Sequence, residues 1–289
     1  MSGLAVGFVW VTILGQYFGG LVAQRSLFIL SATVLIFNIP LVLKWFPEES
    51  FLTEEKFLKS RKFSKLFRDT GRFVKLIPYS PNRMVWGLSS ILRGKAMRHY
   101  SKKLKRYFIA ITLFYTGIGL FFGTITIFLK YVEFSSGQVF GLFLIANITT
   151  GIFFMKVEKV LKRKDPLFIQ ILALGGRVFI FPLVGLIGLT SLDMDIILVL
   201  ISLSFFLIGL TWSFIGLTAS GIINKLSPPT KKGEAFGLHT AIAGIGGGTG
   251  SLIGGIISKQ LGYITNFTTA STFLIISIFI IYRIRSFKG

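Results

Sequence analysis

The chain has 289 residues, of which 52% are hydrophobic and only 15% are charged, and its mean hydropathy is +0.73. One soluble core could not bury this much apolar surface, so the composition excludes a soluble globular protein and predicts an integral membrane protein. With no Cys, 2 His and 11 acidic residues, the sequence excludes a disulfide framework and a thiolate metal site. We therefore expect no enzyme activity, no cofactor and no bound metal.

Eight apolar runs are long enough to cross about 30 Å of hydrocarbon as helices. They cover residues 3–24, 26–46, 105–130, 135–156, 167–191, 195–224, 235–258 and 260–282. The runs are continuous and show no alternation of apolar and polar residues, which favours helices over a β-barrel. The predicted fold class is therefore an all-α membrane protein with eight transmembrane helices.

Basic residues gather on one side of these spans. The segment from Lys44 to Arg106 holds 17 of the 32 Lys and Arg residues, and the loops and tail expected on the same side bring the total to 28. The positive-inside rule then predicts a multi-pass protein of the plasma membrane with both termini in the cytoplasm. This topology accounts for the net charge of +21. The expected partner is the anionic bilayer surface, and no nucleic acid.

The long basic loop contains a segment with helical periodicity, residues 53–77. On a helical wheel its Leu, Phe and Val residues share one half and most of its Arg and Lys residues lie on the other. A basic amphipathic helix of this kind is expected to lie along the inner membrane surface. A docking site for a partner protein is the alternative.

Two short segments far apart in the chain resemble one another. Residues 15–22 read GQYFGGLV and residues 250–257 read GSLIGGII, with glycines at the same three positions. Four spans lie between the long loop and the second copy, whereas only 14 residues precede the first copy. If the two halves match, as in transporters built from repeats, four N-terminal spans are missing and a complete protein would have twelve.

The order of the spans, the basic loop after the second span and the segment KKGEAFGLHTAIAGIGGGTGSLIGGIISKQLGY at 231–263 resemble the major facilitator superfamily. In that family twelve helices form two six-helix bundles joined by a cytoplasmic loop. The resemblance implies a facilitator-type fold that lacks its first four helices. Residues 1–46 would be the last two helices of the N-terminal bundle, 47–104 the central loop, and 105–289 the complete C-terminal bundle with a short cytoplasmic tail.

Two motifs of the family occur in altered form. GQYFGG resembles the glycine motif of the fifth helix, with Gln16 at a position where the family often has Pro. In the loop after 135–156, Glu158, Lys162 and Arg163 match a cytoplasmic latch motif in which Leu161 replaces the glycine. The resemblance implies a latch between the two bundles, and an ordinary basic loop remains the alternative.

Polar side chains inside the spans are the candidate substrate-cavity residues, because such groups are costly in lipid. Arg177 is the one charged residue in a span interior, and Asn147 lies near the middle of its span. A polar stripe on 195–224 lies opposite a stripe of small residues and predicts a cavity wall. The full set of cavity candidates is Gln16, Tyr115, Thr116, Asn147, Arg177, Ser204, Thr211, Thr218 and His239.

Glycines at helical spacing predict close packing of helices, because they let two backbones approach. The predicted packing glycines are Gly15, Gly19, Gly20, Gly246, Gly250, Gly254 and Gly255. The glycine-rich run 244–250 favours a close-packed contact over the alternative, a bending point.

The sequence thus predicts a secondary active or facilitative transporter of a small solute that works by alternating access. The solute, the coupling ion and the direction of transport stay open, and no acidic residue lies at mid-membrane depth in any span. As an incomplete form, the chain is expected to need the missing N-terminal helices or a second copy to transport. The alternative is a non-transporting membrane scaffold whose basic loop binds anionic lipid or a partner protein.

Overall fold

The computed structural model describes residues 97, 100–161 and 163–286. The predicted spans 3–24 and 26–46 and the amphipathic segment 53–77 lie outside these residues. So do Gln16, Gly15, Gly19, Gly20 and Lys162. All of the helices described below belong to one compact unit of the chain.

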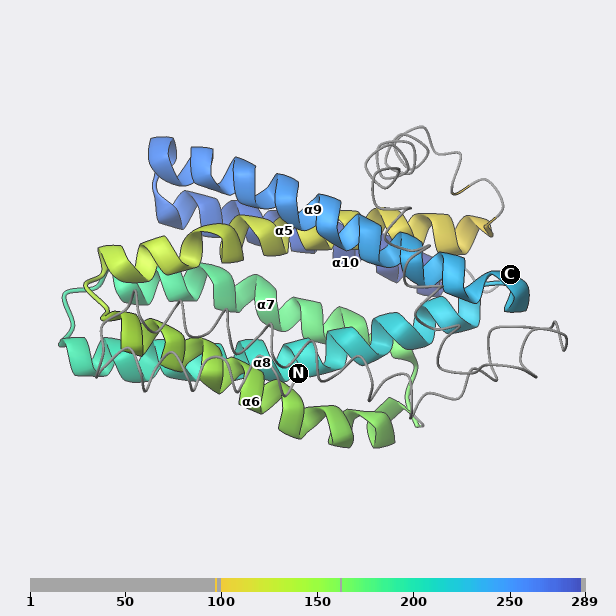
Figure 1. Cartoon of the computed structure of the whole chain (residues 1–289), viewed down its shortest axis with the longest axis horizontal. Helices are drawn as coiled ribbons and strands as arrows, with labels where there is room; N and C mark the ends of the chain where they lie inside the picture. Colours follow the sequence, from red (N-terminus) through yellow and green to blue (C-terminus); the bar gives the residue numbers. More distant parts are fainter. Residues whose placement is uncertain (1–96, 98–99, 162, 287–289) are drawn as a thin grey trace, which may run out of the picture. The chain divides into compact units, whose positions relative to one another are not determined.

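The described part of the chain contains six long helices and one short 3₁₀ helix (Figure 1). They are α5 (Lys102–Tyr131), α6 (Ser136–Leu161), α7 (Pro166–Gly188), α8 (Met194–Leu226), η3 (Pro229–Lys231), α9 (Lys232–Leu261) and α10 (Tyr263–Ser286). Each long helix is long and apolar enough to cross a membrane. The chain is therefore a multi-pass helical membrane protein, and the six spans predicted after residue 104 coincide with these six helices.

Local sequence accounts for several helix boundaries. The Ser101 hydroxyl accepts a hydrogen bond from the Leu104 amide at 3.2 Å and caps α5. Asp165 caps α7 in the same way, and Pro166 follows it at the first helical position, where its missing N–H costs nothing. Between α9 and α10 the chain turns at Gly262, whose φ of +86° suits a residue without a Cβ.

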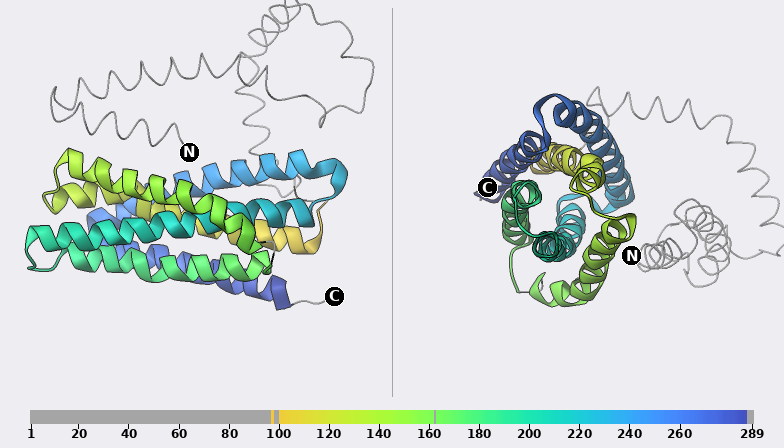
Figure 2. Two further views of the ribbon diagram at one scale, coloured as in Figure 1. Left: turned by 90° about the horizontal axis from the view of Figure 1, so that it is seen from below. Right: turned by 90° about the vertical axis from the view of Figure 1, so that its left-hand side faces the viewer.

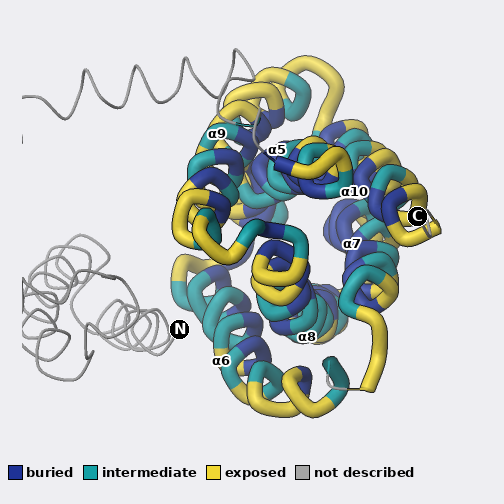
Figure 3. The backbone as a smooth tube through the Cα atoms, turned by 90° about the vertical axis from the view of Figure 1, so that its right-hand side faces the viewer, coloured by how far each residue is buried: buried dark blue, intermediate teal, exposed yellow. Residues whose placement is uncertain are grey.

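The helices pack in a pattern that relates α5–α7 to α8–α10. Helix α5 packs against α9 and α10, α8 packs against α6 and α7, and α7 packs against α10. Exchanging α5 with α8, α6 with α9 and α7 with α10 turns this pattern into itself. Successive helices also run in opposite directions (Figures 1 and 2). The two groups of three helices therefore form an inverted pair, with α7 beside α10 and with α6 and α9 on the opposite side (Figure 3).

Glycines near the middle of α5 and α8 bring backbones into contact at equivalent places in the two halves. A Cβ added to Gly119 of α5 would collide with the carbonyl oxygen of Gly247 in α9. A Cβ added to Gly209 of α8 would collide with the carbonyl oxygen of Ala146 in α6. Lipid gives helices no hydrophobic reason to associate, so contacts of this closeness supply the attraction through dispersion.

Three glycines of α9, spaced four residues apart, lie along the contact with α5. A Cβ added to Gly246, Gly250 or Gly254 would meet a carbonyl oxygen of α5, which belongs to Thr112, Thr116 or Leu120, respectively. The glycine-rich run thus forms a close contact within a continuous helix. Gly255, which was predicted with them, differs because an added Cβ there would meet no atom within 4 Å.

Polar side chains connect the helices at carbonyl groups of their neighbours. Ser277 of α10 donates to the Ala110 carbonyl of α5 at 2.8 Å. Asn266 of α10 donates to the Leu120 carbonyl and to the Thr124 hydroxyl, both at 2.8 Å. Because Ser277 and Asn266 are both fully buried, these bonds supply partners for donors that are shielded from solvent.

One such bond reaches a carbonyl of α7 that a proline leaves without its usual donor. Pro182 has no N–H, so the carbonyl of Val178, four residues earlier, has no donor from its own helix. The Ser271 hydroxyl of α10 donates to that carbonyl at 2.9 Å. The hydroxyl thus joins α7 and α10 at the residue next to Arg177.

Large apolar side chains cover much of the outer surface of the helices. Met155 and Phe179, for example, are 75% and 76% exposed. Exposed apolar residues on this scale would be a liability in water but suit contact with lipid tails. The polar residues that are candidates for function therefore lie between the helices, away from this apolar surface.

Candidate functional site

Arg177 is a fully buried cation between α7 and α8. It is the twelfth of the 23 residues of α7, and its side chain is 0% exposed. Its Nε donates to the Thr211 hydroxyl at 3.0 Å and its Nη2 donates to the Ile208 carbonyl at 3.1 Å. Both partners lie on α8, so the side chain crosses to the neighbouring helix and does not extend toward an end of the membrane.

Two aromatic rings lie near the guanidinium of Arg177. Its central carbon lies 4.7 Å from the centroid of the Trp212 ring and 6.0 Å from that of Phe181. The faces of aromatic rings attract cations, and the attraction grows when water is absent. The rings of Trp212 and Phe181 carry no net charge, however, so they do not neutralise the positive charge of Arg177.

The charge and one donor of Arg177 have no counterpart in the described part of the chain. Its Nη1 is buried and has no hydrogen-bond partner, and no carboxylate of the described residues forms an ion pair with it. A buried cation without an anion is costly, because desolvation is not repaid. Ionisable groups that are retained at this depth usually serve function.

A cavity of about 280 Å³ adjoins Arg177. Its walls come from four helices near the middle of each: Ile118 and Phe122 of α5, Phe143, Ala146, Asn147 and Thr150 of α6, Arg177 of α7, and Ile208, Gly209 and Trp212 of α8. Most of these residues are apolar. The cavity lies at mid-depth of the bundle and between the two inverted halves, since α8 belongs to the second half.

Two of the polar groups in the wall have identified partners. The Thr150 hydroxyl donates to the Gly209 carbonyl at 2.9 Å and so closes one corner of the cavity. The Asn147 amide donates to the Phe143 carbonyl of its own helix at 2.8 Å. An amide NH₂ has two hydrogens, so Asn147 retains a second N–H at the wall of the cavity.

The structure brings some of the predicted cavity residues together and separates others. Asn147 and Arg177 line the same cavity, and Thr211 holds Arg177. Ser204 and Thr218 do not line it: both are buried and donate to carbonyls one turn earlier in α8, those of Leu200 and Phe214.

The remaining described candidates lie in the region where α5 meets α9. Thr116 is buried there and donates to the Thr112 carbonyl. The rings of Tyr115 and His239 lie edge to face, with their centroids 5.8 Å apart. None of the three lines the cavity beside Arg177.

Sequence reasoning missed most of the cavity wall. Phe122, Phe143 and Ile208 are apolar residues in apolar helices, and nothing in their pattern separates them from residues that face lipid. Trp212 carried a usable signal, because tryptophans of membrane proteins gather at the interfaces and this one lies far from either end of α8.

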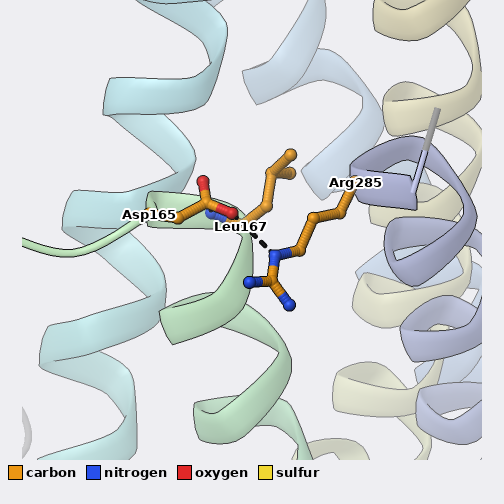
Figure 4. Close-up of polar contacts among 3 residues, drawn as sticks. All are labelled: Asp165, Leu167 and Arg285. Atoms are coloured by element: carbon orange, nitrogen blue, oxygen red, sulfur yellow. Dashed lines mark hydrogen bonds and ion pairs between the residues drawn. The ribbon is translucent and has the colours of Figure 1, made fainter. Parts of the chain in front are cut away.

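Near one end of the bundle, an ion pair joins α7 to α10 (Figure 4). The Arg285 Nε donates to the Asp165 carboxylate at 2.8 Å, while the same carboxylate accepts from the Leu167 amide at 3.3 Å. The Arg285 guanidinium also lies over the Phe168 ring. This cation already has an acidic partner, which sets it apart from Arg177.

The predicted latch residues lie near this ion pair in the sequence, at the end of α6 and in the connection between α6 and α7. Glu158 is exposed in the last turns of α6, and Arg163 is exposed just after that helix. The N-terminal helices that the predicted latch would contact, residues 1–46 and any that precede them, lie outside the described residues. Within those residues, no cluster of His, Asp and Glu could hold a metal ion.

Comparison of the chain with family models, curated proteins and solved structures gave no match.

Proposed function

We propose that this protein is a transporter that moves a small solute across the membrane by alternating access, as its resemblance to the facilitator superfamily implies. One observation carries the proposal: a mid-depth cavity that contains a buried ionisable residue lies where two inverted groups of three helices meet. Transporters place their substrate sites at the midplane, at the interface between such repeats.

The packing of the helices supports this proposal independently of the cavity. Close backbone contacts make α5 and α9 one stiff pair and α6 and α8 another, through Gly119 and Gly209. Between α5 and α8 the contact is slight. Relative movement of these two pairs is the motion that we propose for alternating access, and it would reshape the cavity, whose wall contains residues of α5 as well as of α6 and α8.

Solute exchange in reconstituted vesicles tests the proposal. Vesicles that contain the full chain are loaded with unlabelled glucose, leucine or benzoate, and uptake of the same labelled solute is followed. We expect saturable exchange of at least one of the three, faster than in protein-free vesicles, at protein densities that let a second copy of the chain complete the transport path. If none exchanges faster, the transport proposal is wrong, and the scaffold alternative takes its place.

A pair of matched variants ties any exchange to the cavity. Ile118→Trp places a large ring in the cavity wall and is expected to lower the exchange rate at least about tenfold by excluding solute. Ile127→Trp makes the same change on the same helix at a side chain that is 60% exposed, and it is expected to leave the rate unchanged. Equal effects of the two variants would place the solute path elsewhere.

A further inference from the structure

We propose that the cavity beside Arg177 binds a small organic monoanion, a carboxylate carried on an apolar or aromatic body. The identity of this anion as the transported solute rests on the proposed function, whereas its binding can be measured without transport.

The charge of the ligand follows from Arg177. A guanidinium stays protonated in proteins, so the cavity wall holds a permanent positive charge whose side chain is 0% exposed. Within the described residues no carboxylate pairs with it. An anion in the cavity supplies the missing countercharge and lowers the cost of burying the cation.

The carboxylate group of the ligand is inferred from the hydrogen-bond donors of Arg177 and Asn147 that have no partner among the described residues. The Nη1 of Arg177 is buried without a partner, and Asn147 has a second N–H beyond the one it donates to Phe143. A carboxylate offers two oxygen acceptors and forms strong, short bonds to guanidinium groups. The wall thus presents at least two donors and a single charge, which suits a singly charged group and not a phosphate dianion.

The apolar body follows from the rest of the wall. Phe122, Phe143, Trp212, Ile118 and Ile208 form most of it. These side chains favour an aromatic ring or a short hydrocarbon chain, because a polar body would lose its hydration without compensation. A cavity of about 280 Å³ is large enough for a small molecule of this type.

An anionic lipid could present the same charge, because the phosphodiester of a phospholipid headgroup is also a monoanion. Its headgroup carries a polar glycerol and ester body, which the apolar wall does not match. The geometry therefore favours a soluble carboxylate, and a lipid headgroup becomes an outcome that the experiment must detect.

Calorimetric titration of the purified full chain in neutral detergent tests the proposal. The probes are benzoate, the neutral isostere benzamide, and phosphatidylglycerol added to the micelles. We expect benzoate to bind at least about tenfold more tightly than benzamide, because only benzoate can form the charge-assisted bonds. We also expect phosphatidylglycerol to give no Arg177-dependent heat.

Variants then assign the effect to Arg177. Arg177→Gln is expected to weaken benzoate binding roughly 10- to 100-fold and to leave benzamide binding unchanged, while Arg177→Lys, which keeps the charge but loses the planar fork, lies between. Arg283→Gln is the matched control, because Arg283 is an exposed arginine that lies 5.1 Å from the Phe279 ring. It is expected to bind benzoate as the unaltered protein does.

Trp212 offers a second readout at the site itself. With Trp10, Trp45 and Trp86 changed to Phe, Trp212 is the one tryptophan left in the sequence, and benzoate is expected to change its fluorescence over the calorimetric concentration range. This signal is expected to vanish in Arg177→Gln.

Equal affinity for benzoate and benzamide in the unaltered protein would overturn the proposal even if Arg177→Gln failed to fold. An Arg177-dependent signal from phosphatidylglycerol in place of benzoate would overturn it in favour of a lipid headgroup. Benzoate binding without solute exchange would uphold this site and contradict transport. Exchange of glucose or leucine without benzoate binding would support transport and overturn the proposed anion site.

Discussion

Asp165 performs two tasks with one carboxylate. One oxygen caps α7 through the Leu167 amide, and the other pairs with Arg285 of α10. An N-cap contributes about 0.5–2 kcal/mol, whereas an exposed ion pair contributes about 0.2–1 kcal/mol, and both partners here are 40% or more exposed. The cap is therefore the larger of the two contributions.

We predict that Asp165→Ala lowers the free energy of unfolding by about 1–2 kcal/mol, because it removes both interactions. The measurement is detergent-induced unfolding followed by circular dichroism. Asp193→Ala is the matched control, since Asp193 occupies the N-cap of α8 but its side chain makes no capping hydrogen bond. A loss as large in the control would refute the account of Asp165.

At the scale of residues, polarity decides what the sequence reveals. Arg177 and Asn147 could be predicted as site candidates because a charge or an amide inside an apolar run requires a partner. Their apolar neighbours in the cavity could not, since lipid and a helix neighbour impose the same preference on a side chain. Ser204 and Thr218 were predicted to line the cavity and do not, because each hydroxyl donates to a carbonyl of its own helix and so needs no polar cavity.

Helices α5 and α9 pack closely because glycines at their contact leave the two backbones free to touch. We predict that Gly250→Ala destabilises the protein by about 1–3 kcal/mol, because the added Cβ collides with the Thr116 carbonyl and forces the two helices apart. Gly255→Ala, on the same helix, meets no atom within 4 Å and is expected to be neutral or to stabilise by up to about 1 kcal/mol.

Thermal unfolding of both variants in detergent distinguishes these outcomes. If Gly250→Ala and Gly255→Ala lowered the melting temperature equally, loss of backbone flexibility would explain the glycines better than close packing does. A melting temperature unchanged by Gly250→Ala would exclude the backbone contact.

At the scale of elements, the six helices could be predicted from hydropathy, and their ends could not. The helix α9 begins at Lys232 and ends at Leu261, three residues beyond the predicted run at each side. An apolar run stops at the first charged residue, whereas a helix continues into the interface, where water satisfies charged side chains and lysines extend toward it. The contacts between helices depend on which faces meet, which periodicity alone does not determine in lipid.

At the scale of the whole molecule, the basic loops predict how the chain crosses the membrane. The chain contains no Cys, so a single introduced Cys reports on one site without background. Thr230 and Ser191 are exposed, lie at opposite ends of α8, and each accept Cys with little change in size. We predict that a membrane-impermeant maleimide labels Thr230→Cys only after the cytoplasmic face is opened and labels Ser191→Cys in intact cells.

Labelling of both sites from one face would show that α8 does not span the membrane. Labelling with the two faces exchanged would show that the basic loops are outside, contrary to the positive-inside rule. A cell that expresses the Cys-free chain is the control for reagent specificity.

The inverted relation of α5–α7 and α8–α10 could not be predicted from the sequence. The repeat found there joins residues 15–22 to residues 250–257, which is a different correspondence, and its first copy lies outside the described residues. The inverted relation exists in the packing, through Gly119 in one half and Gly209 in the other, while the residues around them differ. Arg177 belongs to one half only, so the two halves share an architecture but not their chemistry.

The bond from Ser271 to the Val178 carbonyl has a mechanical consequence. Pro182 removes the support that α7 would otherwise give to this peptide group, so a hydroxyl of the opposite half supplies it, one residue from Arg177. Sliding of α10 along α7 must either break this bond or drag the peptide group with it. The peptide group next to Arg177 is thus coupled to the position of α10, and any shift of α10 along α7 reaches the helix segment that carries the guanidinium.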